Sequence, residues 1–242
     1  MNRKINDIGI IRLKETVSTN EEAKRIAENE GDWTVVAADR QLSGKGSKGR
    51  SFYSPEGGVY FTVIVKTPVD YLLLTPYAAV AACRGIKLVT GLQCGIKWVN
   101  DLYLGGKKVC GILTESKICG EDRFALVGIG INLYPSEKSV YPDIAGFLFD
   151  KKPQKDFFED IVGSVSTELR SICEKEPSES VMAEYASLSV LIGEEVVYSD
   201  NGKAETVTVT GISPRGELIT RSEQGDIAFR SGGDIVWKKN KR

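Results

Sequence analysis

A segment rich in glycine and cations is the clearest candidate for binding an anion. Residues 43–50 read SGKGSKGR. Glycine lets backbone amide groups approach an anion closely, and lysine and arginine neutralise its charge. The segment does not match the phosphate-loop pattern Gly-x-x-x-x-Gly-Lys-Ser/Thr, and no further glycine opens a helix as in a dinucleotide fingerprint. Taken alone, it leaves an anion-cradling loop and a solvated surface turn as open alternatives.

A lysine inside the apolar segment GIKWVND is a second candidate. Lys97 stands beside Trp98, so the alternation of a strand directs one of the two inward. A lysine held at a strand end can face negative charge that develops on a phosphate or carboxylate, whereas a lysine solvated at a strand end is the alternative. Asn100 and Asp101 are typical turn formers. Gly111, inside the next predicted strand, indicates close approach of a ligand or of another backbone segment.

Two glycines in VGIGINL alternate with apolar residues, so Gly128 and Gly130 share one face of a predicted strand. A strand without side chains on one face leaves a slot for a flat or narrow ligand. Tight packing against another element is the alternative. Asn132, at the end of the segment, carries an amide that can hydrogen-bond a ligand.

The composition narrows the chemistry. The chain of 242 residues contains no histidine, which excludes Ser-His-Asp and Cys-His catalysis and histidine-containing zinc sites. Its five cysteines include no Cys-x-x-Cys pair, so they predict neither a zinc site nor a disulfide framework. Chemistry must therefore depend on lysine, arginine, carboxylates, asparagine, backbone amides or a carboxylate-bound Mg²⁺. We assign no side chains as metal ligands.

The charge balance and the apolar runs limit the partners. A formal net charge of −1 argues against a broad face for duplex nucleic acid, and nothing at the start of the chain indicates a helix-turn-helix. There is no run of 18 or more apolar residues, and the start MNRKINDIGI lacks the apolar core of a signal peptide. We therefore expect a cytoplasmic protein that binds neither nucleic acid nor a membrane.

Strands joined by short turns, together with a few helices, must position these residues. Thr19 and Glu22 have the capping-box spacing at the start of a helix that Gly31 ends, and residues 75–91 and 152–175 predict two longer helices. Strands are predicted at residues 33–41, 57–68, 95–101, 108–117 and 123–133. Hairpin-type turn residues join the last three strands, which favours antiparallel pairing.

The texture of the sequence changes after Leu188, where short strands are broken by glycine, asparagine and proline. We therefore predict two domains. Residues 1–188 should form an α+β domain, a mixed and largely antiparallel sheet with helices on one face. Residues 189–242 should form a small β-barrel.

Four motifs in order resemble those of the biotin protein ligases: ETVSTNEEA, RQLSGKGSKGRSFYSP, IKWVNDLYLGGKKVCGILTES and VGIGINL. The family's loop reads Gly-Arg-Gly-Arg-x-Gly-Arg after a glutamine, and its strand motif is Lys-Trp-Pro/Val-Asn-Asp followed by Gly-Ile-Leu-x-Glu. The resemblance runs from about Thr16 to Leu133, and the order of the motifs makes it far more specific than any one of them. It implies a class II synthetase-like catalytic domain followed by the family's small C-terminal domain.

The resemblance implies a role for each matching residue. The expected biotin-binding residues are Ser18, Thr19, Asn20, Gln41, Gly44, Lys48, Gly49, Lys97 and Gly111. The expected nucleotide-binding residues are Lys45, Arg50, Asn100, Asn132 and Lys238. Lys97 and Lys45 are expected to be catalytic, Lys97 by polarising the biotin carboxylate and the α-phosphate. Gly128 and Gly130 are expected to form the slot for the thin bicyclic body of biotin.

The implied reaction activates biotin with MgATP to biotinyl-5′-adenylate and transfers biotin to a lysine of a biotin carboxyl carrier protein. Phosphoryl and adenylate chemistry needs positioning and charge neutralisation more than a strong base, in agreement with the absence of histidine. Two alternatives remain. One is a lipoate or octanoate protein ligase of the same fold, whose members typically carry a histidine near the glycine-rich loop. The other is a non-catalytic protein that binds biotin or its adenylate.

The glycine-rich loop departs from the family pattern. Lys45 and Ser47 stand where the pattern has arginines, while Lys48 and Arg50 keep their charge. Lysine loses the bidentate contact that arginine makes with a phosphate, and serine loses the charge altogether. A lost charge-assisted hydrogen bond costs about 1.5–3 kcal/mol, so we expect weaker retention of the adenylate than in a typical member.

Overall fold

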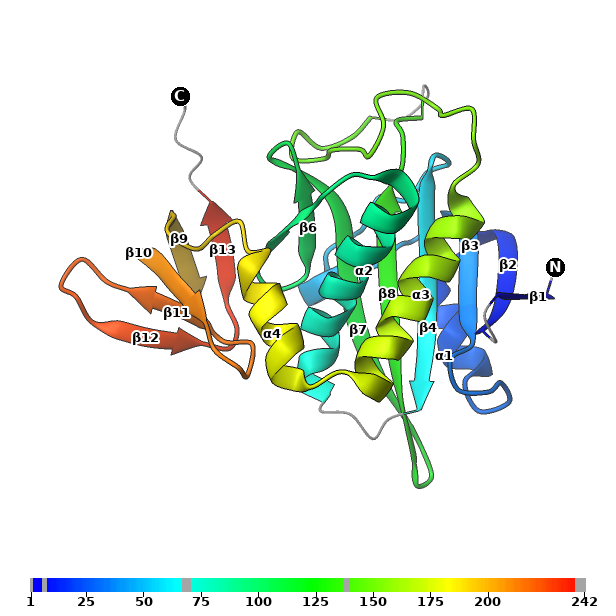
Figure 1. Ribbon diagram of the computed structural model, residues 1–242, viewed down its shortest axis with the longest axis horizontal. Coiled ribbons are helices and arrows are strands. Elements are labelled where there is room, and N and C mark those ends of the chain that lie inside the picture. The colour runs from blue at the N-terminus through cyan, green and yellow to red at the C-terminus, as the bar shows by residue number, and fades with distance from the viewer. Residues whose placement is uncertain (1, 6–7, 67–70, 137–139, 238–242) are drawn as a thin grey trace.

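The computed structural model describes residues 2–5, 8–66, 71–136 and 140–237 and is built on one large sheet (Figure 1). The strands of this sheet, in spatial order, are β1 (Asn2–Ile5), β2 (Ile8–Thr16), β3 (Val35–Gln41), β4 (Gly58–Lys66), β8 (Asp122–Asn132), β7 (Lys107–Cys119), β6 (Asp101–Leu104) and β5 (Gly95–Lys97). β2 and β3 pair in parallel, and the other neighbours pair antiparallel. The mixed, largely antiparallel sheet that the sequence predicts is confirmed.

The long helices cover one face of this sheet. These are α2 (Leu74–Thr90), α3 (Phe158–Lys175) and the shorter α4 (Ser178–Ser187), which lie in front of the strands in Figure 1. In β4 the side chains of Val59, Phe61, Val63 and Val65 belong to the main core, as the two-residue period of a strand requires. Residues 71–90 are long and apolar enough to cross a membrane, but 67% of their most apolar window is buried, which is typical of a core helix.

The opposite face of the sheet carries the short helix α1 (Thr19–Ile26), together with a second, smaller core. Ala23 and Ala27 pack there against Val36 and Ile64, which alternate with the side chains of the main core. Ser18, Thr19 and Asn20, which are candidate ligand-binding residues, lie at the start of this helix. The helix therefore places them against the face of the central strands on which Gly128 carries no side chain.

Residues 195–237 form a second, five-stranded antiparallel sheet. Its spatial order is β12 (Ile227–Arg230), β11 (Leu218–Arg221), β10 (Lys203–Ile212), β9 (Glu195–Asp200) and β13 (Asp234–Trp237). The small C-terminal β-structure is thus present, although among the described residues β12 and β13 do not pair to close a barrel. The connection from α4 pairs with β5 through Ile96 and Leu188, so the two sheets meet at the edge of the large one.

Two local predictions differ from the structure. Residues 95–101 do not form one strand, because the chain turns at residues 98–100 and Asp101 opens β6. The capping box is also not formed, since the N-cap of α1 is Ser18 and it makes no side-chain capping bond. The hydroxyl of Thr19 is instead directed into the interior, where it contacts Gln41.

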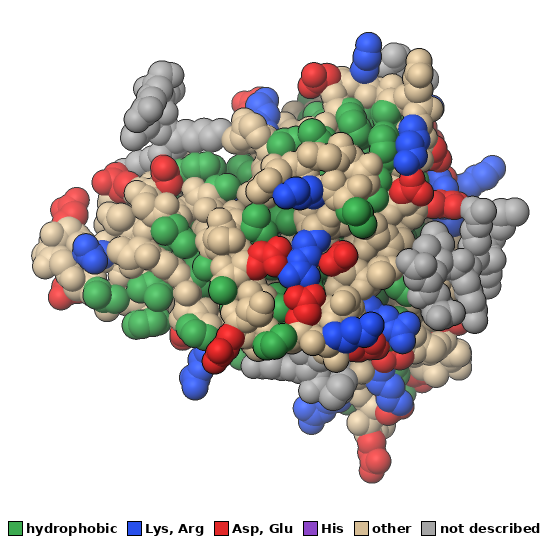
Figure 2. Space-filling view, viewed as in Figure 1, with side chains coloured by type: hydrophobic (Ala, Val, Ile, Leu, Met, Phe, Trp, Pro, Cys, Tyr) green, Lys and Arg blue, Asp and Glu red, His purple; other side chains and the backbone are tan. Residues whose placement is uncertain are grey.

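An arginine ties the three covering helices together. Arg84 on α2 lies 2.7 Å from Glu176, which follows α3, 2.5 Å from Glu184 on α4 and 3.6 Å from Glu168 on α3. Basic and acidic side chains lie against one another on this face of the molecule (Figure 2). The half-buried guanidinium satisfies two carboxylates in bidentate fashion, which aligns the helices above the sheet.

Candidate active site

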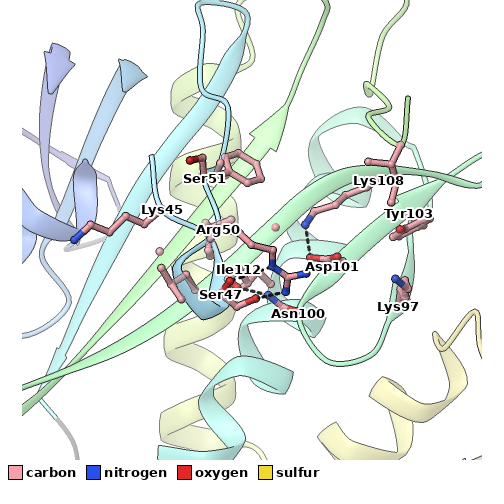
Figure 3. A pocket seen from close by; sticks show the side chains of 18 of the residues that line it. Lys45, Ser47, Arg50, Ser51, Lys97, Asn100, Asp101, Tyr103, Lys108 and Ile112 are labelled. Carbon is pink, nitrogen blue, oxygen red and sulfur yellow. Dashed lines mark hydrogen bonds and ion pairs between the residues drawn. The ribbon is translucent and has the colours of Figure 1, made fainter. Parts of the chain in front are cut away.

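A cavity of about 510 Å³ lies where the large sheet, the glycine-rich loop and the C-terminal sheet meet. This volume is in the range of sites for small ligands. Its lining includes, from the predicted set, Ser18, Thr19, Asn20, Gln41, Lys45, Arg50, Lys97, Asn100 and Gly111. Residues from Ser18 to Trp237, far apart in the sequence, are therefore brought around one space (Figure 3).

One wall of the cavity is a chain of buried polar groups at the start of α1. The side-chain oxygen of Gln41 accepts hydrogen bonds from the backbone N–H of Thr19 at 2.8 Å and from its hydroxyl at 3.1 Å. The amide of Gln41 donates to Ser54, whose hydroxyl donates to the carbonyl of Phe52. Gln41 therefore caps α1 from a neighbouring strand, and its donor and acceptor atoms have fixed directions.

Asn20 continues this polar wall and is almost fully buried. Its Nδ2 donates to Glu115 at 2.7 Å, and its Oδ1 accepts from the hydroxyl of Thr62 at 2.6 Å. Thr62, on β4, also lies 2.9 Å from the hydroxyl of Thr19. The sequence analysis did not single out Thr62, although alternation along β4 places it opposite the main core.

Side chains of the protein itself approach the slot expected at Gly128 and Gly130. A side chain on Gly130 would meet the ring of Phe52 at 2.5 Å, and one on Gly128 would meet the amide of Asn20. A side chain on Gly111 would reach the same ring at 2.9 Å. Gly128 and Gly130 nevertheless line the cavity, so the approach of a ligand to this face of the strand stays a prediction. The three glycines give room to Phe52 and Asn20, and all five residues line the cavity.

The glycine-rich loop folds as a tight hairpin at the edge of the cavity. The backbone N–H of Gly46 donates to the carbonyl of Arg50, and that of Phe52 donates to Gly44. Lys48 and Gly49 both adopt positive φ angles, 57° and 72°, at the tip. A side chain on Gly44 would collide with Phe52 and Ser54, so only glycine fits between the two arms.

The cations of the loop are already paired. Lys45 contacts Glu21 of α1 at 2.5 Å and extends away from the other labelled side chains (Figure 3). Lys48 lies 2.9 Å from Asp234, and Arg50 lies 3.6 Å from the same carboxylate. The hydrogen bond from Lys48 lowers the pKa of Asp234. A phosphate that enters the cavity must therefore displace Glu21 or Asp234 from these cations.

Lys97 differs from the other cations that line the cavity. Its ammonium donates to the backbone carbonyl of Ile235 at 3.0 Å and lies 5.8 Å from the ring centroid of Tyr103. Burial lowers the pKa of Lys97 below the ordinary lysine value, an effect that Asp101 opposes and Lys108 reinforces. Within the part of the chain that the structure describes, Lys97 alone among these cations makes no ion pair. An anion that enters the cavity therefore gains the most interaction energy at Lys97, because no carboxylate has to be displaced there.

Lys108 is a cavity residue that the sequence analysis missed. It pairs with Asp101 at 2.6 Å, and its ammonium lies 5.8 Å from the ring centroid of Phe52 (Figure 3). The turn at Gly105 and Gly106 sets the register that places Lys108 opposite Tyr103. The sequence signal that could have identified Lys108 was this hairpin, because a two-glycine turn sets which residues of its two strands lie opposite each other.

The C-terminal sheet also contributes to the cavity. Ile235, Val236 and Trp237 of β13 line it, and the ring of Trp237 lies 6.0 Å from that of Tyr103 in an edge-on arrangement. From this part of the chain the sequence analysis named Lys238 alone, and none of these three residues.

Four predicted residues lie outside the lining of the cavity. Gly44, Lys48 and Gly49 shape or close the loop, and the amide of Asn132 donates to the carbonyl of Gly146 at 3.0 Å. Lys238 lies outside the described residues. Asn100 does line the cavity, but its side chain donates to the carbonyl of Ile112 at 2.7 Å and so holds the turn against β7 (Figure 3).

The side chains of the cavity do not gather a metal-binding set. Asp101 is the single carboxylate among the described lining residues, and Lys108 occupies it. No group of three or more histidine, cysteine, aspartate or glutamate side chains in the described ranges is arranged so that it could hold a metal ion. The lining instead offers amides, hydroxyls, cations and aromatic rings, which suit an organic ligand with anionic groups.

Comparison with known proteins agrees with this geometry. The model of the biotin/lipoate A/B protein ligase family matches residues 9–132, just over half of the chain. The chain belongs to the biotin/lipoate A/B protein ligase family. The matched residues contain nearly every lining residue of the large sheet, and the resemblance inferred from the four sequence motifs is confirmed.

Individual relatives are similar to this chain over different lengths. The bifunctional ligase/repressor BirA of Bacillus subtilis is 39% identical over 133 residues, which are 52% of this chain and 40% of that protein. The biotin–[acetyl-CoA-carboxylase] ligase of Mycobacterium tuberculosis is 26% identical over 237 residues, covering 93% of this chain and 87% of its own length. The chain thus spans less than half of the Bacillus relative.

The fold as a whole has a close counterpart among solved structures. A biotin protein ligase from Aquifex aeolicus, in complex with biotin and ATP, superposes with a TM-score of 0.78 at 28% identity. The superposition covers 96% of this chain and 99% of that protein. Both the large sheet and the C-terminal sheet therefore have the architecture of that ligase.

Proposed function

We propose that the protein is a biotin protein ligase that activates biotin with ATP and transfers it to a lysine of a biotin carboxyl carrier protein. The observation that carries the proposal is Lys97, a half-buried cation without an ion pair, placed between a wall of fixed amides and hydroxyls and the cationic loop. The Aquifex ligase, crystallised with biotin and ATP, supports this assignment.

The polar wall suits the recognition end of biotin. Thr19, Asn20 and Gln41 present donors and acceptors whose directions are fixed by their own hydrogen bonds, as a ureido ring requires. A buried polar wall of this kind rejects ligands that leave its groups unpaired. Phe52, seated over Gly130, supplies an apolar surface for the body of the ligand.

In the first step, a carboxylate oxygen of biotin attacks the α-phosphorus of ATP, the bond from that phosphorus to the bridging oxygen breaks, and pyrophosphate leaves. Lys97 stabilises the negative charge that the carboxylate and α-phosphate share, and Lys45 and Arg50 can move onto the phosphates once they leave Glu21 and Asp234. The Mg²⁺ enters with ATP as part of the substrate.

In the second step, the amine of a carrier lysine attacks the acyl carbon of the adenylate. The bond from that carbon to the phosphate oxygen breaks, AMP leaves, and the nitrogen loses a proton. The hairpin of the glycine-rich loop borders the cavity, so it can shield the mixed anhydride from water until the carrier arrives.

Biotin-dependent exchange between ATP and pyrophosphate tests the activation step. Exchange with biotin and none with lipoate supports the ligase, whereas exchange with lipoate alone supports a lipoate ligase. Binding of biotin without exchange supports a non-catalytic binding protein. Transfer of radiolabelled biotin to a purified carrier domain, with ATP and Mg²⁺, then tests the acceptor, and no transfer at saturating concentrations rejects the proposal.

A further inference from the structure

Lys97, at the end of β5, and the first two residues of the turn that follows it are each held by a residue from the last third of the chain. Lys97 donates through Nζ to the carbonyl of Ile235 at 3.0 Å, and Trp98 donates through Nε1 to the carbonyl of Gly216 at 2.8 Å. The carbonyl of Val99 accepts from the hydroxyl of Tyr185 at 2.9 Å. Two of these partners belong to the C-terminal sheet region and one to α4, so the turn is fastened from outside its own sheet.

The two aromatic anchors are buried, so their hydrogen bonds are shielded from water. Trp98 is 8% exposed and Tyr185 is fully buried. Burial raises the pKa of the Tyr185 phenol, so its hydroxyl stays protonated and keeps donating. A buried carbonyl that loses its donor cannot replace it with water, so each bond holds its part of the turn firmly.

The backbone at Gly216, whose carbonyl accepts the hydrogen bond from Trp98, is itself packed against neighbouring helices. A side chain on Gly216 would lie in contact with Leu73 and Pro76, at the start of α2, and with Met182 of α4. The carbonyl that Trp98 reaches is therefore fixed to the same helices that cover the sheet. At the other end of the turn, Asn100 and Ile112 exchange two hydrogen bonds at 2.7 and 2.9 Å.

We propose that Trp98 and Tyr185 are positioning residues that aim Lys97 at the reacting carboxylate and phosphate, a proposal that rests on the proposed function. Neither residue lines the cavity of about 510 Å³, although Trp98 lines a smaller one of about 260 Å³ that shares Lys97 with it. They act by fixing the two peptide units that follow Lys97 in the chain. Displacement of a catalytic group by about 1 Å can cost as much as a hundredfold in rate.

The substitutions Trp98→Phe and Tyr185→Phe test this, because each removes one hydrogen-bond donor and keeps most of the ring. The readout is biotin-dependent exchange between ATP and pyrophosphate, at a temperature well below the melting point of every variant. We expect kcat to fall about tenfold, with the KM values for biotin and ATP within about twofold of the parent. Thr90→Val, which removes the hydrogen bond from Thr90 to Ile86 inside α2, is the control and should keep the parent kcat.

A double-mutant cycle separates positioning from a general loss of structure. In a Lys97→Met background, Trp98→Phe and Tyr185→Phe should have no further effect on the residual rate, because the group that they aim is absent. Effects of equal size in both backgrounds overturn the proposal, as does an unchanged kcat in both single variants. If the parent protein itself shows no exchange with biotin, the proposed function fails, and the positioning proposal fails with it.

Discussion

Lys48 of the glycine-rich loop donates to Asp234 of the C-terminal sheet at 2.9 Å, and to the neighbouring carbonyl of Gly233 at 2.8 Å. Arg50 reaches the same carboxylate at 3.6 Å. The loop that is expected to cover a phosphate is thus fastened by an internal anion. Under the proposed function, Asp234 would compete with a phosphate for the same two cations.

The substitution Asp234→Asn should therefore strengthen binding of the nucleotide. The amide cannot neutralise Lys48 and Arg50, so these cations no longer need to leave an ion pair. Because the pair is about half exposed and its energy is correspondingly small, we expect a two- to fivefold lower dissociation constant for ATP, about 0.4–1 kcal/mol. Isothermal titration at low salt measures it. Asp226→Asn, an exposed change in the same sheet, is the control, and weaker binding in Asp234→Asn contradicts the prediction.

The substitution Gly130→Ala should unseat Phe52. The added methyl group would meet the ring at 2.5 Å, and overpacking of this kind costs about 1–3 kcal/mol in the free energy of unfolding. Gly31→Ala is a matched control, since nothing lies within 4 Å of its new methyl group. Urea unfolding of both variants measures the difference. Equal stability of the two would show that Phe52 moves aside without cost.

The pH dependence of the activation step should report on Lys97. Burial holds its pKa below the ordinary value of 10.5, with Asp101 and Asp234 opposing the shift and Lys108 and Arg50 adding to it. The proposed mechanism requires the cationic form of Lys97, so the rate of exchange should fall as pH rises through this lowered pKa. In Lys97→Arg the guanidinium stays charged, so the fall should move to higher pH. An identical fall in both proteins would assign it to another group.

Ser47→Arg should slow the release of the adenylate. At present the hydroxyl of Ser47 accepts a hydrogen bond from Arg50 at 2.9 Å, so position 47 supplies no charge to a ligand. A charge-assisted bond from the new arginine should reduce the dissociation rate by about ten- to a hundredfold. A chase with unlabelled biotin and ATP measures release of the labelled adenylate. Ser47→Gln, of similar length but uncharged, is the control, and an unchanged rate in Ser47→Arg would rule out this explanation.

Arg84→Met should loosen the helical layer. It leaves Glu176 and Glu184 without their shared partner, and we expect a loss of about 1–2 kcal/mol at neutral pH. Arg84 lowers the pKa of Glu176, so its contribution is full above the unfolded-state pKa of a glutamate and is lost as pH falls through the lower folded value. The difference between the parent and Arg84→Met should therefore shrink in acid.

Chemical denaturation from pH 7 down to about pH 3 checks this prediction, because glutamates titrate within that range. Arg25→Met, which removes an exposed pair with Glu22 on α1, is the control and should leave stability nearly unchanged at every pH. A difference that stays constant down to the lowest pH would mean that packing of the Arg84 side chain, and not its charge, is responsible.

The sequence by itself determined the class of the fold and named nine of the candidate site residues that line the cavity. The alternation in β4 and the two-glycine turn before β7 act over a few residues, so local pattern predicts them. The glycines at 111, 128 and 130 correctly indicated a close approach. The sequence did not show that Phe52 and Asn20 make that approach, because a missing side chain does not say what fills the space.

Only the tertiary structure decided how Lys97 is aimed and what its neighbours are. Its partner Ile235 lies 138 residues further along the chain. The groups that hold the turn after Lys97, the hydroxyl of Tyr185 and the carbonyl of Gly216, come from α4 and from the C-terminal sheet region. The same holds for Asp234, which meets the loop across 186 residues. Helix and strand periods describe which face of an element is buried, whereas contacts between two sheets depend on how whole layers pack. That packing joins the two sheets into one site.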